Sequence, residues 1–384
     1  MRTLDDVYSF VSKKSKSVDS SGIRKVFDLA QKIENPINLS IGQPDFDVPE
    51  EIKREAIRAI EKGFNKYTVT QGIEPLREKL SDFINAKKGT NYSKDDGFIT
   101  SGVSGALTLL FMALLDQGDE VIIFDPYFVM YKHLVNLFGG RAVIVDTYPD
   151  FKIANRRKEI ENKITDRTKA IVINSPSNPT GKVMSRDDIY TVYEIAKSSN
   201  LLVVSDEIYD EFVYDGEFFS IASIYPEGTV LLGGFSKTYA MTGWRVGFAF
   251  GPSPIIREMI KLQQYTFVCA PSFAQYASIK ALDYDMSEYI RRYKVKRDMV
   301  YEGLKENFDI VKPEGAFYAF PSPKELTISV EEFVNECIKE GVLIIPGNVF
   351  SERSTHFRLS FAASDETIRK GIERINEVYK KFSK

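Results

Sequence analysis

The sequence predicts an α/β fold, with a mostly parallel, seven-stranded sheet covered by helices on both faces and a smaller α+β domain beside it. Three observations support this prediction. Seven short apolar runs between residues 98 and 250 are continuous rather than alternating, which is typical of strands buried on both faces. Helical patterns separate several of these runs, which favours a parallel sheet. After about residue 281, short strands alternate with longer charged helices.

The elements of the large sheet follow in chain order. Proline opens two early helices, at Pro49 and Pro75, where a first-turn proline is tolerated. The predicted strands are Phe98–Thr100, Val121–Phe124, Ala142–Val145, Ala170–Asn174, Leu201–Ser205, Val230–Leu232 and Val246–Phe250. The helices expected around them are Glu50–Lys62, Pro75–Lys88, a segment that ends at Leu115, Tyr127–Phe138 and Arg186–Ser199.

Two stretches near the N-terminus are expected to join the second unit. Residues Ile23–Ile33 show helical spacing of apolar positions, and Asn38–Ile41 reads as a short strand. The C-terminal elements expected are helices Met286–Asn307 and Val330–Glu340, a last helix from Glu366, and strands within Asp309–Lys312, Gly315–Phe320, Val342–Ile345 and Phe357–Phe361. We therefore expect an N-terminal arm over 1–21, a large domain over 46–281, and a small domain built from 22–45 and 282–384.

Composition argues against several function classes. The 384 residues carry a net charge of −3, so no global basic field recruits nucleic acid or an anionic membrane. Two cysteines and two histidines leave little room for a disulfide framework or a metal cluster. The longest apolar run, Ala106–Leu115, is too short to span a bilayer, and no signal pattern opens the chain. We expect a cytoplasmic protein without a metal site.

Polar and aromatic residues gather where the predicted strands end. In an open parallel sheet, ligands bind beyond the carboxyl ends of the strands. The residues that follow the strands are Gly102, Val103 and Ser104, then Tyr127 and Phe128, Asn178, Asp206 and Tyr209, and Ser236 and Lys237. Each also has a structural explanation, because glycine turns, Asn-Pro loops and capping aspartates occur without function. Their joint occurrence favours one ligand site.

Lys237 and Arg245 indicate the chemistry of that site. An ammonium between two buried strands is costly without a task or a partner, and desolvation makes a lysine a good nucleophile toward an aldehyde. Arg245 offers a planar fork suited to a phosphate. Together they suggest pyridoxal 5′-phosphate. Taken alone, this stretch fits a loop lysine and a structural arginine about equally well.

Over nearly its whole length, from Leu39 to Ala362, the chain resembles the class I and II aminotransferases, which are pyridoxal-phosphate enzymes of fold type I. It is most similar to their bacterial and archaeal aspartate and aromatic subgroup. The motifs that carry the resemblance are Asn178-Pro179-Thr180-Gly181, Asp206-Glu207-Ile208-Tyr209 and the stretch Ser236–Gly247, in this order. The resemblance implies a seven-stranded, pyridoxal-phosphate-binding large domain and an aminotransferase activity.

The resemblance also implies a role for each motif residue. Lys237 would form the internal aldimine and shuttle the proton, and Asp206 would pair with the pyridine nitrogen. Asn178 and Tyr209 would hydrogen-bond the phenolic oxygen, and Phe128 would stack on the ring. The phosphate would be bound by Gly102, Val103, Ser104, Ser236 and Arg245, and by Tyr67 reaching across a homodimer interface. Asn178–Pro179 is a candidate cis peptide.

Substrate binding is assigned in the same way. Arg358 would hold the α-carboxylate of the substrate as a bidentate pair, with the Gly42 backbone over the same group. Without the resemblance, Arg358 reads as a surface arginine at a strand end. Aspartate-preferring relatives carry a lysine two positions after the loop glycine, where this chain has Ser104. The aromatic residues Phe128, Tyr127 and Phe267 are suited to bind a substrate with an aromatic or apolar side chain.

We therefore expect an aminotransferase of aromatic or broad specificity, with aspartate as the other candidate donor, that passes the amino group to 2-oxoglutarate by a ping-pong mechanism. A fold-type-I C–S β-lyase is the nearer alternative, because the ring, the lysine and the aspartate serve both reactions. A non-catalytic pyridoxal-phosphate sensor is a remote one, because the residues before Ile23 are too few for a helix-turn-helix domain.

Overall fold

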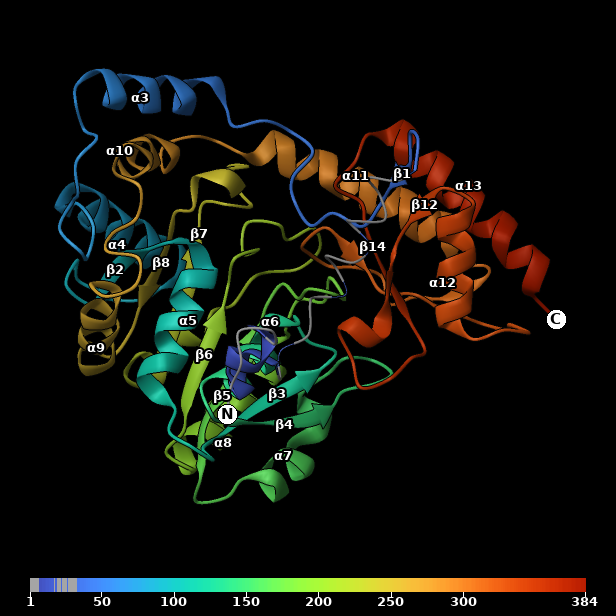
Figure 1. Cartoon of the computed structure of the whole chain (residues 1–384), viewed down its shortest axis with the longest axis horizontal. Helices are drawn as coiled ribbons and strands as arrows, with labels where there is room; N and C mark the ends of the chain where they lie inside the picture. The colour runs from blue at the N-terminus through green and yellow to red at the C-terminus, as the bar shows by residue number, and fades with distance from the viewer. Residues whose placement is uncertain (1–6, 17, 19–21, 23–25, 27–32) are drawn as a thin grey trace.

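The computed structural model describes residues 7–16, 18, 22, 26 and 33–384. Its centre is a seven-stranded sheet with the strand order β2-β8-β7-β6-β5-β3-β4 (Figure 1). The strands are β2 (Gly97–Thr100), β3 (Glu120–Asp125), β4 (Arg141–Asp146), β5 (Thr168–Asn174), β6 (Leu202–Asp206), β7 (Thr229–Gly234) and β8 (Gly247–Phe250). Each strand begins and ends within two residues of its predicted range.

All neighbouring strands are parallel except β8, which runs antiparallel to both β2 and β7. The predicted fold class, α/β with a mostly parallel sheet, is therefore confirmed. Strands β3, β6 and β7 are buried over almost their whole length. Edge strand β4 instead alternates between buried and more exposed positions. Burial on both faces explains why the central strands read as continuous apolar runs.

Helices cover both faces of the sheet, and alternate residues of one strand enter different cores. In β3, Ile123 packs with α5 (Gly102–Leu114), α6 (Met130–Leu137) and α9 (Ser253–Gln263). Its neighbour Ile122 packs with α7 (Arg157–Lys163) and α8 (Arg186–Ser198) on the other face. That second face also carries α3 (Glu50–Glu61), α4 (Glu74–Lys88) and α10 (Ser272–Ala281), beside β2 and β8. No helix was predicted at α7, α9 or α10.

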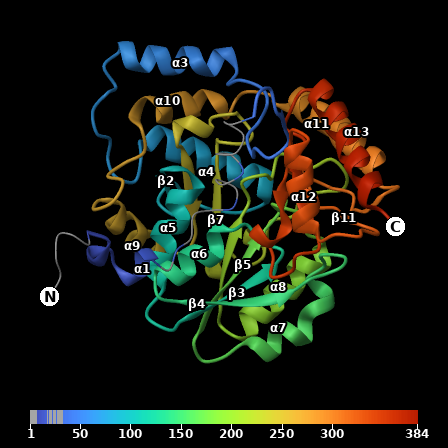
Figure 2. The ribbon, with the colours of Figure 1, turned by 45° about the vertical axis from the view of Figure 1, so that its right-hand side comes forward.

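A second unit stands to one side of the sheet, at the right in Figure 1, and Figure 2 shows it turned forward. Its helices are α11 (Ser287–Leu304), α12 (Val330–Lys339) and α13 (Asp365–Phe382). Its short strands are β1 (Ile37–Asn38), β9 (Phe308–Asp309), β10 (Tyr318–Ala319), β11 (Ser322–Pro323), β12 (Val342–Leu343), β13 (Ile345–Pro346) and β14 (Phe357–Ser360). β1 pairs in parallel with β12, which joins the N-terminal segment to the C-terminal unit.

The N-terminal arm and the domain boundaries stay predictions. Within the arm, the structure has one turn of 3₁₀ helix at Val7–Phe10 and a short helix α1 (Lys13–Lys16), neither of which buries a residue. Most of the helix expected over Ile23–Ile33 lies outside the described residues. In the part of the chain that the structure describes, no helix is long and apolar enough to cross a membrane.

Candidate active site

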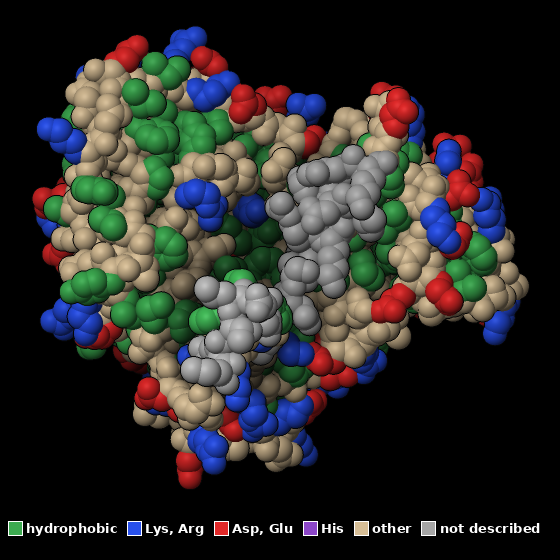
Figure 3. Space-filling model, in the orientation of Figure 1, with side chains coloured by type: hydrophobic (Ala, Val, Ile, Leu, Met, Phe, Trp, Pro, Cys, Tyr) green, Lys and Arg blue, Asp and Glu red, His purple; other side chains and the backbone are tan. Residues whose placement is uncertain are grey.

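A cavity of about 260 Å³ lies at the carboxyl ends of the parallel strands, where the second unit meets the sheet. Figure 3 shows a hollow between these two parts of the molecule, with hydrophobic and basic side chains around it. The cavity brings together most of the sequence-predicted site residues: Gly42, Val103, Ser104, Phe128, Asn178, Asp206, Tyr209, Ser236, Lys237, Arg245 and Arg358. These residues are spread over the chain from residue 42 to residue 358.

Asp206 is the last residue of β6 and is almost fully buried. The Tyr131 hydroxyl donates a hydrogen bond to its Oδ2 at 2.7 Å, and the Ile208 N–H donates to its Oδ1 at 3.2 Å. Burial raises the pKa of Asp206 to about 6, although both hydrogen bonds oppose the shift. A buried carboxyl with fixed oxygens is suited to hold a proton shared with a ring nitrogen.

Lys237 lies in the loop after β7 and is half-buried. Its Nζ donates a hydrogen bond to the Gly42 carbonyl oxygen at 2.7 Å. Burial, together with the positive charges of Arg358 and Arg245, lowers the pKa of Lys237 to about 8. A larger fraction of neutral amine is thus present near neutral pH than for a surface lysine, as a nucleophilic or proton-accepting amine requires.

Arg245 and Gly102 form a cradle at the start of α5. The backbone of Arg245 is left-handed, with φ 55°, and its Nη1 donates to the Thr242 carbonyl oxygen at 2.9 Å. Gly102 has φ +66°, and a Cβ at this position would lie 2.4 Å from Arg245 Nη2. Only glycine therefore lets the guanidinium approach this helix start. Backbone N–H groups and a guanidinium at a helix N-terminus are suited to a phosphate.

Arg358 lies on β14 and is only 1% exposed, so its interpretation as a surface arginine is wrong. Its Nη1 donates to Asn178 Oδ1 at 3.1 Å and its Nη2 to the Ser40 carbonyl oxygen at 2.7 Å. Among the described residues, Arg358 Nε has no hydrogen-bond partner. A buried cation that lines a cavity is suited to a carboxylate ligand.

The chain matches the family model described as Aminotransferase class I and II over residues 34–375. It belongs to this family. It is 39% identical to a probable aspartate aminotransferase of Methanocaldococcus jannaschii, over 96% of this chain and 100% of that protein. It is 38% identical to aromatic-amino-acid aminotransferase 2 of Thermococcus litoralis, over 96% and 98% of the two chains.

A solved structure of Thermus thermophilus aspartate aminotransferase with maleate superposes with a TM-score of 0.92, at 34% identity over 96% of this chain and 99% of that chain. The resemblance and the fold type are thereby confirmed, and the protein is a pyridoxal-phosphate-dependent aminotransferase. Asp206, Lys237 and the cradle at Gly102 and Arg245 fit this cofactor, which requires a ring partner, an amine and a phosphate site.

Of four predicted aromatic residues, Phe128, Tyr127, Phe267 and Tyr67, only Phe128 lies in the cavity. Tyr127 is buried away from it and donates a hydrogen bond to Glu352 at 2.5 Å. Phe267 is not among the lining residues, and neither is Tyr67, whose side chain is 85% exposed. The Asn178–Pro179 peptide is cis, as the sequence predicted.

Sequence reasoning missed several residues of the site. Tyr131 on α6 and Tyr318 on β10 both line the cavity, and the Tyr318 and Tyr209 hydroxyls share a hydrogen bond at 2.9 Å. Asn174 donates to the Asp206 carbonyl oxygen at 2.9 Å. Of these residues, only Asn174 could have been predicted, because it is a polar residue at the carboxyl end of a predicted strand. In the described part of the chain, no group of His, Cys, Asp and Glu side chains could hold a metal ion.

Proposed function

We propose that the protein transfers the amino group of an L-amino acid, of aromatic or broad specificity, to 2-oxoglutarate in two half-reactions of a ping-pong mechanism. The observation that supports this most strongly is a single cavity lined by the low-pKa amine of Lys237, the buried carboxyl of Asp206 and the buried guanidinium of Arg358. These groups match the needs of cofactor and substrate in one place.

Lys237 is proposed to be the residue to which the cofactor aldehyde is attached and the group that moves the substrate proton. Bound pyridoxal phosphate supplies an electron-accepting ring that stabilises negative charge at the substrate Cα. Asp206 holds a proton at the ring nitrogen, and its hydrogen bonds from Tyr131 and Ile208 fix the carboxyl orientation. Freed from the cofactor, the Lys237 amine is the base that accepts the Cα proton.

The other site residues are proposed to bind and orient the cofactor and the substrate. Arg245, Ser236 and the start of α5 are proposed to hold the phosphate. Phe128 is proposed to cover the ring, and Asn178 and Tyr209 to donate to its phenolic oxygen. Arg358 is proposed to bind the substrate carboxylate, because its guanidinium lines the cavity and is already fixed by Asn178 and Ser40.

We also propose a homodimer in which Tyr67 reaches the phosphate site of the partner. Tyr67 is exposed, and it lines one groove with Phe64 and Val69, which are exposed as well. A surface with several exposed apolar side chains is typical of an interaction site. A cytoplasmic location stays an expectation from the sequence.

The amino acid that donates the amino group is proposed to have an apolar or aromatic side chain. Among the described residues, the basic side chains that line the cavity are Lys237, Arg245 and Arg358, and each has a task already. The apolar residues Leu107, Met130 and Phe128 line the same cavity as Ser104. Such a lining offers no partner for a second carboxylate. Aspartate remains the second candidate donor, because several relatives are named aspartate aminotransferases.

A single-turnover experiment tests this specificity. The cofactor-loaded protein is mixed with tyrosine, phenylalanine or aspartate without a keto acid, and conversion to the pyridoxamine form is followed by absorption. We expect tyrosine and phenylalanine to react at least about tenfold faster than aspartate. Ser104→Lys should raise the aspartate rate, whereas Ser104→Ala should leave the order unchanged. Faster conversion by aspartate in the wild type would contradict the specificity, and pyruvate release from cystathionine would indicate the β-lyase.

A further inference from the structure

An acidic segment begins at Asp206. Asp206, Glu207, Asp210 and Glu211 lie within six consecutive residues, and Glu207 is as deeply buried as Asp206. Buried carboxylates so close together repel one another unless a cation compensates them. The segment also carries Tyr209. The position of the segment therefore determines where two proposed cofactor contacts, Asp206 and Tyr209, lie.

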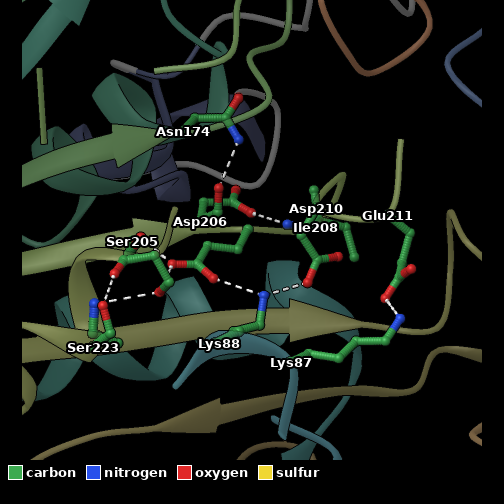
Figure 4. Close-up of polar contacts among 12 residues, drawn as sticks. Lys87, Lys88, Asn174, Ser205, Asp206, Ile208, Asp210, Glu211 and Ser223 are labelled. Atoms are coloured by element: carbon green, nitrogen blue, oxygen red, sulfur yellow. Dashed lines mark hydrogen bonds and ion pairs between the residues drawn. The ribbon is translucent and has the colours of Figure 1, made fainter. Parts of the chain in front are cut away.

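Lys88 supplies the cation. It is the last residue of α4, directly before Gly89, whose left-handed backbone ends the helix. Its side chain is 3% exposed, and its Nζ donates to Glu207 Oε2 at 2.8 Å and pairs with Asp210 Oδ2 (Figure 4). Although burial opposes it, the charges of Asp210 and Glu207 raise the pKa of Lys88, so the ammonium stays charged.

Glu207 is held from the other side as well. Its Oε1 accepts hydrogen bonds from the Ser205 hydroxyl at 2.8 Å and the Ser220 hydroxyl at 2.6 Å. Its backbone N–H donates to the Leu232 carbonyl oxygen on β7 at 2.9 Å. Glu207 is therefore fixed to β7, to the Ser220 loop and, through Lys88, to α4. It faces away from the cavity, which it does not line.

We propose that Lys88 is a positioning residue of the active site, whose buried ammonium binds Glu207 and Asp210 and thereby fixes the Asp206–Tyr209 segment and its charge. The inference rests on the proposed roles of Asp206 and Tyr209. Lys88 itself touches neither the cavity nor a reacting atom, so it acts through the segment alone. Ile208, within the same segment, donates the backbone hydrogen bond to Asp206 Oδ1.

The electrostatic consequence has a definite sign. Burial is the main cause that raises the pKa of Asp206, and the charge of Glu207 adds to it. The hydrogen bonds from Tyr131 and the Ile208 N–H and the charge of Lys237 lower this pKa. Without Lys88, the negative charge of Glu207 and Asp210 is no longer compensated. The uncompensated negative charge then favours the protonated form of each titratable group near the segment, including a nitrogen of the bound cofactor. Without the charge of Glu207, the opposite shift follows.

Lys88→Met and Lys87→Met are the matched pair that tests this. Lys87 is the preceding residue of α4, has a 45% exposed side chain and pairs with Glu211 at the surface. Pyridoxal phosphate binding is measured by titration, and the midpoint of the pH-dependent cofactor band by absorption. We expect Lys88→Met to weaken binding about tenfold and to move the midpoint to higher pH. Lys87→Met should change affinity by less than about twofold, as for an exposed pair.

Glu207→Gln keeps the shape of the segment and covers the case in which Lys88→Met does not fold. It should move the midpoint to lower pH, and the double variant Lys88→Met with Glu207→Gln should return it toward the wild type. A Lys88→Met protein that only melts earlier, with unchanged affinity and midpoint, would overturn the inference, as would equal effects of Lys87→Met. If Asp206→Asn leaves affinity and midpoint unchanged, the proposed role of Asp206 fails instead.

Discussion

Replacing Arg358 by lysine tests how the substrate is bound. The guanidinium uses Nη1 on Asn178 and Nη2 on Ser40, and its Nε has no partner among the described residues. Lysine keeps the positive charge but loses the planar fork that binds a carboxylate with two bonds. One charge-assisted hydrogen bond contributes about 1.5 to 3 kcal/mol, so we expect kcat/KM to fall about 10- to 150-fold.

The assay separates substrate binding from cofactor binding. Single-turnover rates are measured over a range of amino acid concentrations, and pyridoxal phosphate affinity is titrated on the same preparation. Arg358→Lys should raise the amino acid concentration needed for half-maximal rate and leave cofactor affinity within about twofold. Arg353→Lys is the matched control, because Arg353 lies at the surface and pairs with Asp146. It should change neither quantity.

Two results would refute this reasoning. A kcat/KM within twofold of the wild type would show that the carboxylate does not depend on the Arg358 fork. An equal loss of cofactor and substrate affinity would show that Arg358 supports the structure, through Asn178 and Ser40, rather than the substrate.

Three further predictions concern the cofactor side of the cavity. Tyr131→Phe removes the 2.7 Å hydrogen bond that lowers the pKa of Asp206, so this pKa should rise, with cofactor affinity about tenfold weaker by titration. Gly102→Ala places a Cβ 2.4 Å from Arg245 Nη2 and should weaken binding of pyridoxal phosphate but not of phosphate-free pyridoxal, as measured by competition. Lys237 has a folded-state pKa of about 8, below its ordinary 10.5, so its burial as a cation destabilises the cofactor-free protein below pH 8 and this penalty fades as pH rises to 10.5. Lys237→Met should therefore stabilise the cofactor-free protein by about 1 to 3 kcal/mol at pH 7 and by less at pH 10, in denaturant unfolding.

The sequence predicted the sheet well because its strands are buried on both faces and flanked by turn residues. It predicted most of the cavity for a related reason, since strand ends meet at one edge of a parallel sheet. The sequence did not predict helix α10, because its buried face includes polar residues that interrupt the apolar pattern. Gln275 is one of them, and it accepts a hydrogen bond from the Ile73 N–H at 2.9 Å.

The misses in the site have a similar origin. Tyr318 approaches the cavity from the second unit, and no local pattern says which residues of that unit are buried there. Arg358 comes from the same unit and was predicted only through the family resemblance. The pairing of Lys88 with Glu207 joins residues 119 positions apart in sequence, so neither residue carries a local signal of it. Tertiary packing alone brings these groups together.

The central claim is that Lys237 carries the cofactor. The most direct measurement is the visible absorption spectrum of the protein loaded with pyridoxal phosphate, compared between the wild type and Lys237→Ala, with the modified lysine mapped by mass spectrometry after borohydride reduction. We predict an aldimine band that is present in the wild type and lost in Lys237→Ala, with the reduced cofactor found on Lys237 alone. An unchanged band in Lys237→Ala, or a cofactor mapped to another lysine, would contradict the claim.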